Sequence, residues 1–208
     1  MKEFQNLTIT ISKAEVDNLA DYLSGLSNHW LRDGEKEESV TKFTAEKMFC
    51  FNYMVEDDAY ASLWLAEKDN DALYVSNIVP LQSSSLSISE YNDIQRKFCS
   101  ELLSIASRKF TFNLDLSKEH IEIEDLLSNE AAQAFKSFSR LANKSTGRSH
   151  PLDQTRWFEF IRLAFESENK ISPEQLEKFL VEDGWDQSSS LDLACDFEYS
   201  LDLLTYLK

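Results

Sequence analysis

The residues best suited to chemistry form a run of carboxylates close to the end of the sequence. The run contains Asp192, Asp196, Glu198 and Asp202, with the phenols of Tyr199 and Tyr206 among them. At 100° per residue these side chains project from one side of a helix, opposite an apolar stripe. No lysine or arginine lies between Lys178 and Lys208 to offset the charge. An acidic face studded with aromatic rings suits a basic protein, so we predict that these residues bind such a partner.

The same pattern also fits a solvated helix face whose acids pair with lysine or arginine from another helix. Like charges four residues apart, as at positions 192 and 196, destabilise an isolated helix by about 0.2–0.5 kcal/mol per pair. Nothing nearby in the sequence offsets that cost. The sequence leaves both explanations open.

A second candidate site is cationic. Arg148 and His150 precede Pro151, a residue suited to the first turn of a helix. Because helix N-termini attract negative charge, we treat the pair as a candidate anion site. The alternative is an ordinary helix start.

Motifs for catalysis, metals and nucleotides are missing from the sequence. Its 4 glycines do not have the spacing of a phosphate-binding loop. The histidines, at positions 29, 120 and 150, are too scattered for a zinc site. We therefore expect no metal and no cofactor, and we favour a protein without enzymatic activity.

Composition narrows the range of partners. The chain has 37 acidic and 21 basic residues, which gives a formal charge of -16. Such a charge repels phosphate backbones and anionic lipid, so we expect neither direct nucleic-acid binding nor a membrane partner. It also fits an acidic protein of the bacterial cytosol, or a nucleic-acid mimic with carboxylates spaced like phosphates. The oligomeric state stays open.

Cys50, Cys99 and Cys195 lie far apart and inside predicted strands or helices. This placement favours buried, reduced thiols over a disulfide framework. Apolar runs are far shorter than the ~20 residues of a membrane span. Together these features predict a cytoplasmic protein.

The elements that carry these residues predict an α+β fold in two parts. Residues 1–116 form a lobe around an antiparallel meander from Met48 to Val79, with turns at residues 56–58 and 68–71. Residues 117–208 form a helical lobe of about four helices packed on the first. The last of these helices runs from about Ser188 to Tyr206 and carries the acidic face.

Local patterns predict further elements in the first lobe. A strand at residues 7–11 leads into a helix with a capping box at Ser12 and Glu15, and a second capping box lies at Ser87 and Glu90. Alternation over residues 110–116 predicts another strand. Residues 32–41 show no apolar period and are expected to form a mobile loop.

The order strand, helix, three-strand meander, helix, strand resembles the first part of the Gcn5-related acetyltransferase fold. The resemblance covers about the first 116 residues and concerns element order alone. It implies a coenzyme-binding pocket at the connection 80–87, near Asn77, Gln82 and Ser83. That connection lacks the spaced glycines of the family.

We therefore predict a non-enzymatic, cytoplasmic protein-binding module of an accessory, inhibitory or immunity type, which engages a basic partner. The alternative is a small transferase with a degenerate acetyltransferase-like core.

Overall fold

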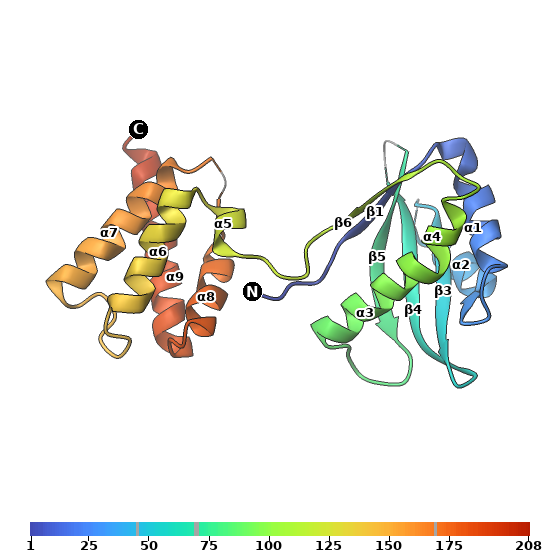
Figure 1. Cartoon of the computed structure of the whole chain (residues 1–208), viewed down its shortest axis with the longest axis horizontal. Coiled ribbons are helices and arrows are strands. Elements are labelled where there is room, and N and C mark those ends of the chain that lie inside the picture. Colours follow the sequence, from blue (N-terminus) through green and yellow to red (C-terminus); the bar gives the residue numbers. More distant parts are fainter. Residues whose placement is uncertain (45, 69–70, 169) are drawn as a thin grey trace. The chain divides into compact units, whose positions relative to one another are not determined.

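A computed structural model of the chain describes residues 1–44, 46–68, 71–168 and 170–208 (Figure 1). The chain divides into two compact units, residues 2–119 and Met1 together with residues 120–208. Each unit has a hydrophobic core of its own.

The unit of residues 2–119 contains a six-stranded antiparallel sheet with helices, which confirms the predicted α+β class. Its strands are β1 (Leu7–Thr10), β2 (Trp30–Arg32), β3 (Met48–Val55), β4 (Asp58–Lys68), β5 (Ala72–Pro80) and β6 (Asn113–Leu116). Its α-helices are α1 (Val16–Ser24), α2 (Gly34–Thr41), α3 (Ile88–Phe98) and α4 (Ser104–Ala106), with a π-helical turn at Cys99–Leu103 between the last two.

The predicted meander is confirmed as the centre of the sheet. The sheet has the strand order β2-β3-β4-β5-β1-β6. Within it, β3, β4 and β5 lie side by side (Figure 1). Glu56 and Asp57 form the first turn with φ of 49° and 70°, the left-handed conformation that a tight hairpin with twisted strands requires. The second predicted turn lies partly outside the described residues, at Asp69 and Asn70.

Strand β1 lies between β5 and β6, and buried and less buried residues alternate along it. Ile9 is opposite Leu73 of β5 on one side and Leu114 of β6 on the other. The strand predicted at 110–116 begins only at Asn113, since β6 pairs with β1 over Leu7–Thr10 and has no partner strand beyond it among the described residues.

The helix after β1 starts later than predicted. The Ser12 side chain makes no capping bond, and Lys13–Glu15 form a 3₁₀ turn before α1 begins at Val16. The Glu15 N–H donates to the Ser12 carbonyl at 2.8 Å, the i to i−3 contact of a 3₁₀ helix. The capping box at Ser87 and Glu90 is confirmed at the start of α3.

The expected loop at residues 32–41 is wrong. Arg32 ends β2, and residues 34–41 form α2, capped by the Asp33 side chain, which accepts from the Lys36 N–H. The helix has no apolar stripe, and a carboxylate holds it in place instead. Glu37 accepts hydrogen bonds from the Arg32 guanidinium and from the Cys50 N–H of β3, both at 2.9 Å.

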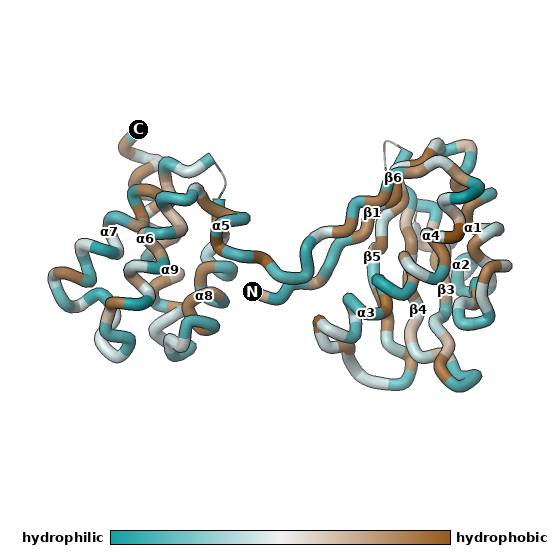
Figure 2. Tube along the Cα trace, in the orientation of Figure 1, coloured by the Kyte–Doolittle hydropathy of each residue, from teal (hydrophilic) through white to brown (hydrophobic). Residues whose placement is uncertain are grey.

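The second unit is helical. Its helices are α5 (Ile123–Leu126), α6 (Asn129–Leu141), α7 (Pro151–Glu166), α8 (Pro173–Glu182) and α9 (Gln187–Tyr206). Hydrophobic and hydrophilic positions are interspersed along these helices (Figure 2). Aromatic rings fill the core: Phe138 lies 4.8 Å from Trp157, and Phe160 stacks on Phe197 at 5.4 Å between ring centroids.

The end of α8 turns the chain toward α9. Gly184 has φ of 86°, and the Trp185 N–H donates to the Leu180 carbonyl at 3.0 Å, which together form a Schellman-type stop. Trp185 is buried as a result. None of the helices in the described part of the chain is long and apolar enough to cross a membrane.

Candidate functional site

Helix α9 has a sharply defined start and a buried side. Asp186 caps it by accepting the Ser189 N–H at 2.9 Å. Leu193, Ala194 and Phe197 are buried in the core of the helical unit. The opposite side of the helix is therefore left to face outward.

We define the outer face of α9 by the exposed residues opposite that core. These are Leu191, Asp192, Cys195, Glu198, Tyr199, Asp202, Leu203 and Tyr206, with Leu207 just beyond the helix end. Tyr199 is 68% exposed and Tyr206 is 87% exposed. The outer face thus includes all the predicted partner-binding residues except Asp196.

Asp196 is committed to contacts inside the molecule. Its carboxylate accepts the indole N–H of buried Trp157 at 2.7 Å and pairs with the Arg148 guanidinium at 2.6 Å. Both partners lie far from Asp196 in the sequence, which is why the periodicity of α9 grouped it with the exposed acids. We therefore leave Asp196 out of the partner-binding surface.

The ion pair between Asp196 and Arg148 also involves the predicted anion site at Arg148 and His150. The Arg148 charge is offset by Asp196. The His150 ring accepts the Leu152 N–H through Nδ1 at 3.3 Å and so caps α7, the ordinary helix start that the sequence also allowed. The structure thus joins Arg148 to one of the acids of α9 rather than to His150.

The three other acids of α9 differ from Asp196. No cation among the described residues forms an ion pair with Asp192, Glu198 or Asp202, and all three are exposed. Arg148 offsets the repulsion expected between positions 192 and 196, because it pairs with Asp196. The repulsion between Glu198 and Asp202, also four residues apart, is not offset within the described part of the molecule.

An open cavity of about 690 Å³ lies beside the first turns of α9. Its wall consists of Ser145, Thr146, Gly147, Arg148, Ser149, Gln154, Ser189, Asp192 and Leu193. Most of these groups are hydroxyls, an amide or a carboxylate that can accept hydrogen bonds. Asp192 belongs both to this cavity and to the outer face of α9.

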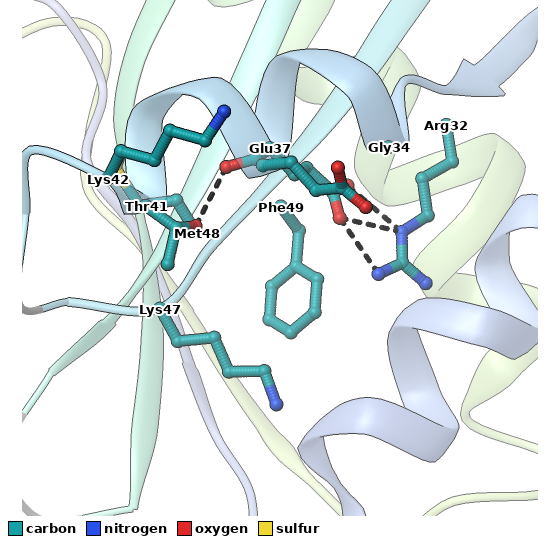
Figure 3. Close-up of a pocket in the computed structure, with 9 residues that line it drawn as sticks. Arg32, Gly34, Glu37, Thr41, Lys42, Lys47, Met48 and Phe49 are labelled. Atoms are coloured by element: carbon teal, nitrogen blue, oxygen red, sulfur yellow. Dashed lines mark hydrogen bonds and ion pairs between the residues drawn. The ribbon is translucent and has the colours of Figure 1, made fainter.

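A second cavity, of about 580 Å³, lies between α2 and β3 (Figure 3). Sequence reasoning missed it because α2 was expected to be a loop. The buried ring of Phe49 lies between two cations, 5.2 Å from the Arg32 guanidinium carbon and 5.6 Å from the Lys47 ammonium. Arg32 pairs with Glu37 and Asp21, and Lys47 pairs with Asp17, so these charges serve the packing of α2 and β3.

A polar cluster joins α2 to strands β3 and β4. The Lys36 ammonium donates to Ser62 Oγ and to Asn52 Oδ1, both at 3.2 Å, and pairs with Asp33 at 3.3 Å. Ser62 is only 1% exposed, so a substrate cannot reach its hydroxyl. Burial raises the pKa of the neighbouring Cys50 thiol to about 11, which keeps it in the unreactive neutral form at neutral pH.

The cysteines are all free, but their burial differs from the prediction. Cys50 is buried and Cys99 is half-buried, whereas Cys195 is exposed. Cys195 lies on the outer face of α9, four residues from both Leu191 and Tyr199. The four-residue apolar spacing on this side of α9 is a local pattern that the sequence itself contains.

Comparison with protein-family models, with curated proteins and with solved structures found no match to this chain. The connection 80–87, where an acetyltransferase-like core implies a coenzyme pocket, lines neither of the two cavities described above. The transferase alternative stays a prediction. We take the outer face of α9 as the candidate site, because it combines exposed carboxylates with exposed aromatic rings.

Proposed function

We propose that the chain is a non-enzymatic, cytoplasmic protein-binding module of an accessory, inhibitory or immunity type, and that the outer face of α9 binds a basic protein. The observation that carries this proposal is the combination on one helix face of Asp192, Glu198 and Asp202, without a pairing cation in the described residues, and two exposed tyrosines.

Energetics support a partner for this face. Like charges along one helix cost stability, and lysines or arginines of a partner would turn that repulsion into attraction. Tyrosine rings supply large contact areas at low entropic cost, which is why they are enriched at interfaces. The overall charge of -16 would also steer a basic protein toward this chain.

A solvated helix face is the competing explanation. The exposed apolar residues of the outer face argue against it. Leu191 is 49% exposed and Leu203 is 46% exposed, in addition to the tyrosines. Single exposed apolar residues are common on protein surfaces, but a contiguous set on one helix marks an interaction site.

The test is capture from a native lysate by the full chain and by the variant D192N/E198Q/D202N. The control is E46Q/D57N/D58N, which neutralises the same residue types at exposed positions of the other unit. We expect a stoichiometric basic protein that the intact chain and the control retain. The affinity of that protein, measured with purified components, should fall at least about tenfold for the α9 variant and decline with added salt.

The proposal is wrong if the α9 variant and the control hold the captured protein equally well. It is also wrong if no protein is retained through the outer face. Circular dichroism of both variants must match that of the intact chain, so that lost binding is not lost folding.

A further inference from the structure

Tyr206 lies beside a ridge that the other five exposed apolar residues of the outer face of α9 form. Their spacing is four residues throughout, and we call the set the apolar ridge: Leu191, Cys195, Tyr199, Leu203 and Leu207. Leu207, the last member, is 69% exposed. At 1.5 Å per residue the ridge extends about 24 Å along the helix.

Carboxylates flank the apolar ridge on both sides. The neighbouring row one residue further on contains Asp192, and the row on the other side contains Glu198 and Asp202. A groove therefore lies on each side of the ridge, and each groove is bordered by at least one carboxylate that forms no ion pair among the described residues. This arrangement defines the shape and the charge that a partner needs in order to fit the face.

We infer that the element of the partner that binds α9 is an α-helix with its own apolar ridge at four-residue spacing and lysine or arginine on both sides. This inference rests on the proposed function and specifies the partner. Ridges at four-residue spacing interdigitate when two helices cross at about -50°. The apolar ridge of one helix then lies in a groove of the other, and the basic side chains reach the carboxylates.

A coiled coil fits the same face poorly. It requires apolar residues every 3.5 residues on average, so that positions seven apart match. Tyr199 and Tyr206 form one such pair on the outer face, but seven residues after Leu191 stands Glu198, and seven after Cys195 stands Asp202. A helix aligned nearly parallel to α9 would bury these carboxylates in its seam.

A second copy of the chain fits poorly as well. Two outer faces of α9 would bring Asp192, Glu198 and Asp202 of one copy against the same acids of the other. Like charges juxtaposed across an interface oppose association. The occupant with complementary charge is a basic helix.

The test uses three synthetic peptides of identical composition, made of leucine, lysine, alanine and two prolines. The ridge peptide has leucine at every fourth position, and the heptad peptide has leucine at the two apolar positions of each heptad. Both carry their prolines in the first turn, which a helix tolerates, whereas the broken peptide has them in the middle. Binding to the full chain is measured by fluorescence anisotropy.

We expect the ridge peptide to bind at least about tenfold more tightly than the heptad and broken peptides. It should also protect Cys195 from alkylation, with the fully buried Cys50 as an internal reference. L203S should weaken binding, whereas L152S, at a leucine 60% exposed on α7, should leave it unchanged.

The inference is overturned if the heptad or broken peptide binds as tightly as the ridge peptide. If that binding is still lost in D192N/E198Q/D202N, the acidic surface stands and only the helical geometry is wrong. If no basic peptide binds through α9, the proposed function fails as well. Protection of Cys195 by rising concentration of the chain alone would identify a second copy as the occupant and also overturn the inference.

Discussion

Asp192 and Asp196 are one helical turn apart, yet the structure gives them different tasks. Asp192 is exposed at the edge of a cavity, whereas Asp196 accepts the Trp157 indole N–H and pairs with Arg148. Trp157 is 0% exposed, and its N–H has the Asp196 carboxylate as its hydrogen-bond acceptor. One acid is available to a partner, and the other holds α9 against α7.

This difference predicts unequal costs of substitution. D196A leaves a buried donor without an acceptor, so we expect it to lower the free energy of unfolding by about 1–3 kcal/mol. D192A removes an exposed carboxylate that forms no ion pair among the described residues, so it should change this free energy by no more than about 0.5 kcal/mol. Urea denaturation followed by tryptophan fluorescence measures both. Equal losses in the two variants would contradict the assigned role of Asp196.

At the scale of elements, helices α2 and α9 form for different reasons. Helix α9 combines a cap, a core side and a length of 20 residues, all of which leave a local pattern. Helix α2 has 8 residues and is anchored to its surroundings by Glu37, which bonds to Arg32 and to the backbone of β3. A short polar helix of this kind depends on tertiary contacts more than on its own propensity.

The cap of α9 makes stability depend on pH. The backbone N–H of Ser189, and then the hydroxyls of Ser189 and Ser188, lower the pKa of Asp186 to about 2. Because this pKa lies below the ~4 of an unfolded aspartate, the charged cap contributes stability that is complete above that value and is lost as pH falls through about 2.

Replacement by asparagine should keep a capping group and remove this dependence. We expect the intact chain to be more stable than D186N above about pH 5, with the difference shrinking between about pH 4 and pH 2 and vanishing below. Thermal unfolding by circular dichroism across this range measures the difference. A difference that stays constant from pH 6 to pH 2 would show that the Asp186 carboxylate does not carry the effect.

At the scale of the whole molecule, two hydrophobic cores organise the chain. One is built on the sheet and includes Phe51 and Phe98, and the other includes Phe138 and Phe160 of the helical unit. Separate cores of this kind give each unit its own source of stability.

Core truncations should therefore act within one unit. F98A should cost about 3–5 kcal/mol in the unit of residues 2–119. Hydrogen exchange followed by mass spectrometry should show lost protection there while residues 120–208 keep theirs, and F160A should show the reverse. Loss of protection across the whole chain in either variant would mean that the two units unfold as one.

Sequence patterns were sufficient where structure is set locally. The meander followed from alternating strands, and the start of α3 followed from a capping box. The prediction failed at residues 32–41 because no apolar period marks α2. Its anchor, a glutamate bonded to a neighbouring strand, resembles an ordinary surface residue in the sequence.

For the candidate site, the sequence by itself determined that α9 exists, which side of it is apolar core, and that its acids have no basic neighbour along the chain. Only the tertiary structure decided which acids remain available. Arg148 and Trp157 reach Asp196 from 48 and 39 residues away, and periodicity along one helix carries no information about such distant partners. Helical spacing fixes the direction in which a side chain projects, whereas the packing of other helices decides what it meets there.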